Sequence, residues 1–179
     1  MKVFTIGHST RTLPELAELL REHGIRRLVD VRTVPRSRHN PQFNAETLPE
    51  ALRREGIEYT HLKELGGLRH ARKDSPNAGW RNASFRGFAD YMATAEFESG
   101  VAKLLSLAER EPAAIMCAEA VPWRCHRSLI SDALLARGVQ VQHITGRGQA
   151  QPHSLTSFAR IAGGRVTYPP ENLELGLSE

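Results

Sequence analysis

Residues 3–32 read VFTIGHSTRTLPELAELLREHGIRRLVDVR, and their pattern indicates the fold class of the whole chain. A short apolar, β-branched run stands at the start of this stretch, over residues 3–6, and RRLVDVR at residues 26–32 is typical of a second buried strand that ends in Asp30 and Arg32. Between them leucines recur at helical spacing, after a capping box with Thr12 at the N-cap and Glu15 three residues later. The pattern therefore predicts a strand, a helix and a second strand.

The same alternation continues along the chain. A second TLPE motif at residues 47–50 predicts another helix with the same capping box, and residues 57–62 predict a third strand. Strands that alternate with helices at this spacing are typical of βα units and a parallel sheet. We therefore expect a Rossmann-like α/β fold of three layers, with a mostly parallel central sheet and helices on both faces. The remaining predicted elements are a helix over 88–109 broken near Ser99–Gly100, strands over 113–118 and 139–144, a helix over 126–138 and a short helical stretch over 157–162.

We expect one domain in two parts. Residues 1–146 form the α/β domain, and residues 147–179 form an irregular C-terminal tail that packs on it. Within the domain, residues 63–86 are rich in Gly, Asn, Ser and Arg and have no periodicity. Loops of this length inside a compact domain are usually functional or disordered. We interpret residues 63–86 as a long basic loop and a possible lid.

Composition and charge narrow the classes of function. Of 179 residues, 40% are hydrophobic and 25% are charged, which is ordinary for a soluble globular protein. No apolar run approaches the roughly 20 residues that span a bilayer, and the N-terminus lacks the apolar segment of a signal peptide. We therefore expect a cytoplasmic protein with no membrane partner, and the oligomeric state stays open. The net charge of +4 and the basic segments 32–38 and 63–86 favour an anionic small molecule or nucleic acid as partner.

Polar side chains follow the first two predicted strands where each one ends. In open parallel α/β sheets, ligands bind beyond these carboxyl ends. Asp30 and Arg32 share one face, so Arg32 with Arg36 would clamp an anion while Asp30 acts as a base or an orienting group. A buried Asp–Arg pair that only holds the loop is the alternative. His8 and Ser9 follow the first strand, where His8 is suited to titrate near neutral pH or to orient a thiol.

MCAEAVPWRCHR, residues 116–127, contains both cysteines of the chain. Cys125 precedes a predicted helix, and the helix N-terminus and basic neighbours favour its thiolate. Glu119 is suited to act as an acid or base, or to orient His126. Cys117 is equally well explained as a small buried hydrophobe. Two cysteines are too few for a disulfide scaffold and lack the usual zinc spacing, so we expect free thiols, no metal and no cofactor.

Two local resemblances each point to a different cysteine as the reactive one. A strand ending at Cys117, followed by a loop and Arg127-Ser128 opening a helix, resembles the active loop of rhodanese-like sulfurtransferases, although the loop is longer here. LVDVR at 28–32 also resembles a strand of those proteins. Cys125-His126-Arg127 instead resembles the Cys-His-Arg core of DNA alkyltransferases.

A broader resemblance appears when the motifs are taken in order. TIGHS (5–9), LVDVRTVPRSR (28–38), LKELGGLR (62–69), FRGFADYM (85–92), MCAEAVPWRCHR (116–127) and HITG (143–146) together resemble the bacterial and archaeal family called domain of unknown function 488. The resemblance covers nearly the whole chain to about Gly146. It implies a three-layer α/β domain and no particular reaction. The residues on the family's characteristic positions are His8, Asp30, Arg32, Pro35, Ser37, Gly66, Gly67, Cys117, Glu119, Cys125, His126 and Arg127.

The leading hypothesis is an enzyme that acts on an anionic, nucleotide or nucleic-acid-related substrate beyond the strand ends. Thiol-dependent transfer and the modification or repair of a nucleobase are its candidate reactions. A non-catalytic module that binds phosphate or nucleic acid is the first alternative, and rhodanese-like sulfur transfer is the second. The candidate catalytic residues are Cys125, His126, Glu119, His8 and Asp30, and the candidate substrate-binding residues are Arg32, Arg36, Ser37, Arg127, Ser9 and Cys117.

Overall fold

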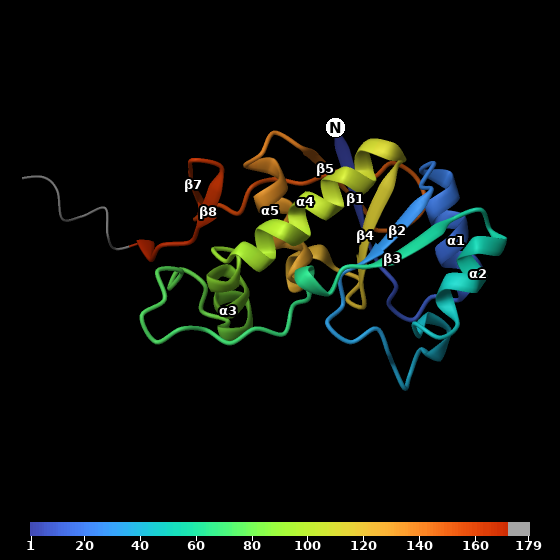
Figure 1. Cartoon of the computed structure of the whole chain (residues 1–179), viewed down its shortest axis with the longest axis horizontal. Coiled ribbons are helices and arrows are strands. Elements are labelled where there is room, and N and C mark those ends of the chain that lie inside the picture. Colours follow the sequence, from blue (N-terminus) through green and yellow to red (C-terminus); the bar gives the residue numbers. More distant parts are fainter. Residues whose placement is uncertain (172–179) are drawn as a thin grey trace, which may run out of the picture.

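A computed structural model describes residues 1–171 and shows an α/β fold built on a six-stranded sheet (Figure 1). The strand order is β3-β2-β4-β1-β5-β6. β1 to β5 are parallel, and β6 pairs antiparallel with β5 at the edge. The predicted mostly parallel α/β sheet is confirmed. The strands are β1 (Lys2–Gly7), β2 (Arg27–Asp30), β3 (Glu58–His61), β4 (Ala113–Cys117), β5 (Gln140–Ile144) and β6 (Gln151–Pro152).

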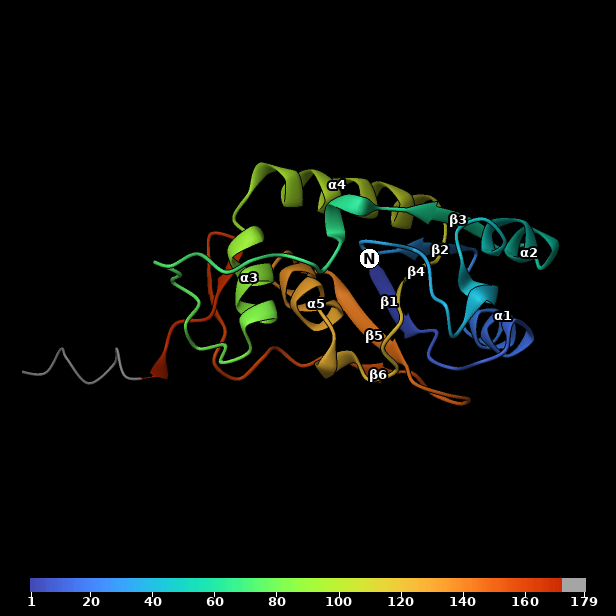
Figure 2. The ribbon, with the colours of Figure 1, turned by 90° about the horizontal axis from the view of Figure 1, so that it is seen from below.

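Helices cover both faces of the sheet, as the sequence predicts (Figure 2). α1 (Leu13–Glu22) and α2 (Leu48–Arg54) pack on one face. α4 (Ala95–Arg110) and α5 (Arg127–Leu135) pack on the other, and α3 (Ala83–Tyr91) packs beside α5. None of the helices in residues 1–171 is long and apolar enough to cross a bilayer. Short 3-10 turns are η1 (Pro41–Phe43), η2 (Lys63–Leu65) and η3 (Pro122–Arg124), and β7 (Arg160–Ala162) and β8 (Arg165–Thr167) form a hairpin.

β4 shows how one strand supplies both cores. All of its residues are buried, as expected of a central parallel strand with helices on both sides. Ala113, Ile115 and Cys117 join the core under α4 and α5, while Ala114 and Met116 join the core under α1 and α2. Because side chains alternate along a strand, Cys117 ends β4 on the side of α5.

The two TLPE motifs begin helices in different ways. In the first, Thr12 Oγ1 accepts from the Glu15 amide at 3.3 Å, and the Glu15 carboxylate accepts from the Thr12 amide at 3.0 Å. In the second, the Thr47 hydroxyl donates instead to the carbonyls of Pro41 and Asn44, at 3.3 and 3.2 Å. The prediction of a second capping box is wrong, because η1 brings two carbonyl acceptors within reach of this hydroxyl.

The predicted helix over 88–109 is two helices, and the predicted break near Ser99–Gly100 is wrong. The chain turns just before Thr94, whose hydroxyl caps α4 by accepting from the Phe97 amide at 3.2 Å. Gly100 lies inside α4, where a Cβ atom would stand 2.9 Å from Leu65. This glycine therefore serves close packing of α4 on η2, and does not break the helix.

The basic loop between η2 and α3 is tied to one buried carboxylate. Asp90 accepts hydrogen bonds from the Arg72 amide at 2.8 Å, the Ser75 hydroxyl at 2.6 Å and the Asn77 amide group at 2.8 Å. The Tyr168 amide donates to the Asn77 side chain at 2.9 Å, so the loop and the C-terminal segment hold each other.

The predicted helical stretch over 157–162 is wrong, because residues 160–162 form β7 of the hairpin. Gly163 and Gly164 connect its strands with φ of 57° and 76°. Two central residues with positive φ are what a tight hairpin turn needs, and a Gly-Gly pair adopts them at little cost. Residues 172–179, the end of the predicted tail, lie outside the described residues.

Candidate active site

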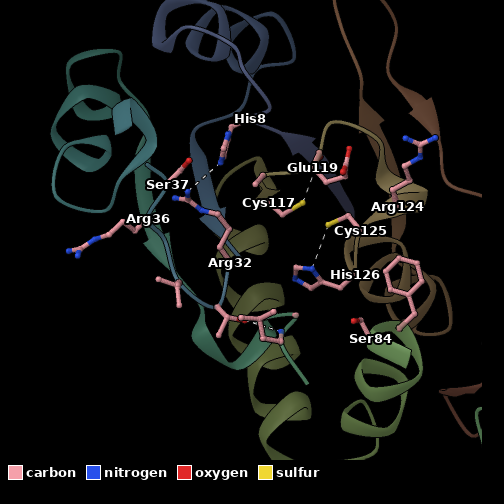
Figure 3. Close-up of a pocket in the computed structure, with 16 residues that line it drawn as sticks. His8, Arg32, Arg36, Ser37, Ser84, Cys117, Glu119, Arg124, Cys125 and His126 are labelled. Atoms are coloured by element: carbon pink, nitrogen blue, oxygen red, sulfur yellow. Dashed lines mark hydrogen bonds between the residues drawn. The ribbon is translucent and has the colours of Figure 1, made fainter. Parts of the chain in front are cut away.

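A cavity of about 370 Å³ opens beyond the carboxyl ends of β1, β2 and β4 (Figure 3). These three strands are neighbours in the sheet, so the loops that follow them meet at one place. The start of α3 and the end of η2 close the other side. The lining residues are His8, Arg32, Thr33, Val34, Arg36, Ser37, Gly67, Leu68, Ser84, Phe85, Cys117, Ala118, Glu119, Arg124, Cys125 and His126.

Cys125 and His126 form a thiol–imidazole pair. Cys125 Sγ lies 3.5 Å from His126 Nδ1, and His126 Nε2 lies 2.9 Å from the carbonyl oxygen of Val31. Because a carbonyl only accepts hydrogen bonds, Nε2 carries the proton of the neutral ring and Nδ1 keeps its lone pair. His126 is thus held in the tautomer that can accept the proton of the Cys125 thiol.

Two neighbours restrict the imidazole of His126. The Phe88 ring meets it edge-on, with centroids 5.1 Å apart. On the other side, a Cβ atom at Gly67 would stand 2.6 Å from Nδ1, closer than real side chains pack. Gly67 therefore leaves room for the ring in the position where it contacts both Val31 and Cys125.

Arg127 places a buried positive charge against the sulfur atoms. Its side chain is 1% exposed, its Nε donates to Cys117 Sγ at 2.9 Å, and its backbone amide donates to Cys125 Sγ at 3.5 Å. The remaining nitrogens donate to Thr5 Oγ1 at 3.2 Å and the Glu119 carbonyl at 2.5 Å. No carboxylate pairs with this guanidinium within residues 1–171. A buried cation without a carboxylate favours negative charge on the adjacent thiols.

The two thiols influence each other's acidity. The pKa of Cys125 is held well below its usual range by the hydrogen bond from Cys117 and by His126 and Arg127, against the effect of burial. The pKa of Cys117 is raised well above its usual range by burial and by its neighbour Cys125. Of the two thiols, Cys125 is therefore the one that loses its proton first.

Asp30 and Arg32 form a buried ion pair behind the cavity. Asp30 accepts from Arg32 Nη2 at 2.7 Å, from Arg32 Nε at 2.9 Å and from the Tyr59 hydroxyl at 2.6 Å. Arg32 Nη2 also donates to the Phe43 carbonyl at 2.7 Å. Only Nη1 of Arg32 is left to face the cavity, 3.4 Å from His8 Nε2. Asp30 is saturated by these contacts and acts here as the residue that orients Arg32.

His8 is held as a neutral acceptor at the same wall. Its Nδ1 donates to the Ser9 carbonyl at 2.9 Å, and its ring stacks on Phe43 with centroids 4.4 Å apart. Burial, and then the charge of Arg32, lower the pKa of His8, while the bond to Ser9 partly opposes them. The lone pair on Nε2 therefore faces Arg32 near neutral pH.

A family model described as domain of unknown function DUF488 matches residues 12–134, from the N-cap of α1 into α5. The chain belongs to this family. The match confirms the family resemblance, and no curated protein and no solved structure matches the chain. The matched part of this DUF488 protein contains Arg32, both cysteines and His126, while His8 and Ser9 precede it.

The structure of this DUF488 protein gathers most predicted site residues around one cavity and leaves three outside it. Asp30 and Arg127 lie behind the lining, where they hold Arg32 and the sulfur atoms. Ser9 also lies outside, with its backbone at φ 48°, a left-handed value that strains a residue with a side chain. Arg127 thus meets the thiols, whereas the sequence predicts that it contacts the substrate. Among residues 1–171, no three His, Cys, Asp or Glu side chains are grouped so as to hold a metal ion.

Glu119 does not orient His126, in contrast to one of the two roles expected for it. Its carboxylate accepts from the Val121 amide at 3.3 Å and points out of the cavity (Figure 3). The carbonyl of Val31 takes the orienting position, because β2 lies beside β4 and its end reaches the imidazole. A backbone carbonyl leaves no mark in a sequence, so residue types alone could not reveal this partner.

Sequence reasoning missed part of the lining. Arg124 borders the cavity and forms no ion pair within residues 1–171; its place beside Cys125 was the available signal. Val34 and Leu68 expose 60% and 75% of their surface at the rim, where they add apolar area. Both stand inside basic segments, where an isolated apolar residue gives little signal. Thr33, Ser84, Phe85 and Ala118 complete the missed set.

Proposed function

We propose that this protein is a thiol-dependent transferase in which Cys125 attacks an anionic substrate held in the cavity. The observation that supports this most directly is the position of His126, whose Nδ1 faces Cys125 Sγ while Val31 holds Nε2. The Cys125 thiolate would accept a group from the substrate, and the remainder of the substrate would leave with the bonding electrons. Because its pKa is the lower of the two, Cys125 is the nucleophile, whereas a rhodanese-like mechanism would use Cys117.

The chemistry of the cavity supports a substrate with an anionic group and an apolar or aromatic body. Arg32 Nη1 faces the interior, and Arg36 and Arg124 extend from opposite sides of the mouth (Figure 3). Arg36 pairs with Glu46, but both side chains are exposed. Exposed ion pairs are weak, so an incoming phosphate or carboxylate can compete for Arg36. With Val34 and Leu68 at the rim, a nucleotide or nucleic-acid-related substrate fits these groups.

The reactivity of Cys125 tests the proposal. We expect its alkylation by a small reagent, followed by peptide mass spectrometry from pH 5 to 9, to have a midpoint below about 8.5, the ordinary thiol value. Since the thiolate is the reactive form, the rate is present above that midpoint and lost as the pH falls through it. His126→Gln should move the midpoint upwards, and the exposed His70→Gln should leave it unchanged. An ordinary midpoint in the wild-type protein would contradict the proposal.

A binding experiment separates the enzyme from the alternative of a non-catalytic module. Adenosine monophosphate, used as the probe, should slow the alkylation of Cys125 by occupying the cavity, and Arg32→Gln should weaken this protection. Cys125→Ala should bind the probe as the wild type does. If the wild-type thiol is unreactive while the probe still binds, the site is a binding module.

A further inference from the structure

We propose that Cys117 is a second reactive thiol of the same site, and that the chain cycles between a dithiol and a Cys117–Cys125 disulfide. The inference rests on the proposed function only in taking Cys125 as the first nucleophile. It assigns to Cys117 a resolving role, in which its sulfur displaces the group that Cys125 has accepted. It also identifies the class of substrate, because only an adduct joined through a good leaving group on sulfur can be resolved in this way.

The positions of the two cysteines support the pairing. Cys117 is the last residue of β4, Cys125 stands just before α5, and both line the cavity. Figure 3 shows the two sulfur atoms side by side, with the Cys117 thiol donating to the Glu119 carbonyl at 3.8 Å. Arg127 contacts both sulfur atoms, through its side chain and its backbone amide. The fold thus brings the two thiols together without any ligand.

The surroundings of Cys117 differ from those of an inert core cysteine. A structural cysteine is usually packed among apolar groups, and its thiol stays protonated. Here Arg127 Nε donates to Cys117 Sγ at 2.9 Å, and the residue keeps 4% of its surface exposed at the cavity wall. A guanidinium at this distance stabilises a thiolate at Cys117 whenever no other anion competes for it.

The electrostatics impose an order on the two steps. While Cys125 is a thiolate, its negative charge raises the pKa of Cys117. Once the Cys125 sulfur is bonded covalently to R, the sulfur atom itself carries no charge, that repulsion is removed, and Arg127 remains beside Cys117. Cys117 should then lose its proton more easily and attack the adduct. The first step therefore activates the second.

The reaction balances with a small disulfide, RS–SR, as the oxidant. Cys125 thiolate attacks one sulfur of RS–SR, the S–S bond breaks, RS⁻ leaves and a Cys125–S–SR mixed disulfide forms. Cys117 then attacks Cys125 Sγ, the mixed disulfide breaks, a second RS⁻ leaves, and the proton of Cys117 passes to a released thiolate. The protein loses two electrons and RS–SR gains them. A small thiol or dithiol reductant restores the two protein thiols by the reverse exchange.

The substrate half R carries negative charge in this proposal. Arg36 and Arg124 stand at the mouth and Arg32 Nη1 stands inside, so a carboxylate or phosphate on R would lie near a guanidinium. The inference therefore names disulfides of anionic thiols as the substrate class. A neutral disulfide of similar size should react more slowly, and this difference should shrink as salt screens the charges.

Dithiobis(nitrobenzoate), an anionic aromatic disulfide that releases a yellow thiolate, tests the pairing directly. With one equivalent per chain, the wild type should release two thiolates for each reagent molecule, retain none, and yield a Cys117–Cys125 cross-linked peptide. Dithiothreitol should then restore both thiols. Cys117→Ser should release one thiolate and retain the other on Cys125. If Cys117→Ser folds poorly, the thiolate count and the cross-linked peptide of the wild type still test the pairing.

The outcomes separate this inference from the proposed function. If wild type and Cys117→Ser both release one thiolate and retain the other, Cys125 is reactive but Cys117 does not resolve, and only the inference is overturned. If neither releases thiolate at neutral pH, Cys125 is not an activated nucleophile, and both fail. Equal rates at low salt with anionic dithiodipropionate and neutral dithiodiethanol, two alkyl disulfides with similar leaving groups, would overturn the assignment of an anionic substrate.

Discussion

Arg127 contacts two buried sets of polar side chains. They differ in whether their hydrogen-bonding groups are all paired or still accessible to a ligand. One is the thiol site. The other is a chain of side chains, called here the histidine chain, that runs through Thr5, His143, His153 and Asp132. Arg127 Nη1 donates to Thr5 Oγ1 at 3.2 Å, and the following links are 2.7, 2.9 and 2.8 Å long.

Every proton of the histidine chain has a determined place. Arg127 only donates and Asp132 only accepts, so each hydroxyl or imidazole between them accepts on one side and donates on the other. The hydrogen bonds therefore all point towards Asp132. This carboxylate also accepts from the Tyr168 hydroxyl at 2.8 Å and the Thr156 amide at 3.1 Å. The histidine chain is fully satisfied, and it joins β1, β5, α5 and the C-terminal segment.

The thiol site contains weaker hydrogen bonds and a free volume. Sulfur is a poor hydrogen-bonding partner, and Cys125, His126 and Arg32 Nη1 all border the cavity. A ligand can reach them without breaking a strong buried hydrogen bond. Satisfied networks stabilise one structure, whereas weakly satisfied groups beside a cavity can exchange their partners. We expect changes in the histidine chain to affect stability and changes in the thiol site to affect reactivity.

The largest effect should follow from Asp132→Ala. His153, Tyr168 and the Thr156 amide would lose their common acceptor, and breaking such a buried network costs about 3–5 kcal/mol. Urea unfolding should show this loss of unfolding free energy. Asp74→Ala, which removes an exposed carboxylate paired with Arg72, should change stability by less than about 0.5 kcal/mol. Similar values for the two variants would show that the histidine chain does not support the fold.

A loss of unfolding free energy smaller than that of Asp132→Ala should appear at acidic pH. Burial, followed by electrostatic repulsion from His153 and Arg127, lowers the pKa of His143 from 6.5 to about 4. Because the pKa of His143 is lower in the folded protein, the unfolded protein binds this proton more readily. The contribution of His143 to the free energy of unfolding is therefore full above pH 6.5 and falls as the pH drops towards 4. This predicts a loss of about 2 kcal/mol of unfolding free energy between pH 7 and pH 5.

His143→Gln provides the control for that pH dependence. Its amide can accept from Thr5 and donate to His153, but it does not titrate. Unfolding measured in urea at pH 7 and pH 5 should show a smaller difference than in the wild type. The lowered pKa of His8 should leave a residual loss of the same sign. An unchanged difference in the variant would mean that His143 is not the group responsible.

The smallest effect on stability, and a clear one on reactivity, should come from Gly67→Ala. The new methyl would displace the His126 ring, since its Cβ would stand 2.6 Å from Nδ1. Overpacking at one site costs about 1 kcal/mol, and a rise of one unit in the pKa of Cys125 would slow its alkylation about tenfold at a pH below the wild-type midpoint. Gly146→Ala, where nothing lies within 4 Å, is the matched control. Normal reactivity of Cys125 in Gly67→Ala would show that the position of the ring is not critical.

The two TLPE motifs show where local sequence stops being sufficient. Four identical residues form a full capping box at Thr12 and none at Thr47. The difference arises from Pro41 and Asn44, whose carbonyls reach the second hydroxyl. In the same way, Gly100 suggests a helix break to local reasoning, but it serves the contact with η2. Each wrong prediction lies where a packing partner overrides a local preference.

Local sequence was enough to predict the alternation of strands and helices, the mostly parallel sheet and the clustering of polar residues at the strand ends. These features depend on local periodicity and on the rule that parallel strands end at one edge. The tertiary structure decided which nitrogen of His126 faces Cys125, because the Val31 carbonyl that sets the tautomer comes from another strand. It also decided that Arg127 contacts the two sulfur atoms from behind the cavity. Contacts between residues far apart in the chain depend on packing, and no local pattern encodes them.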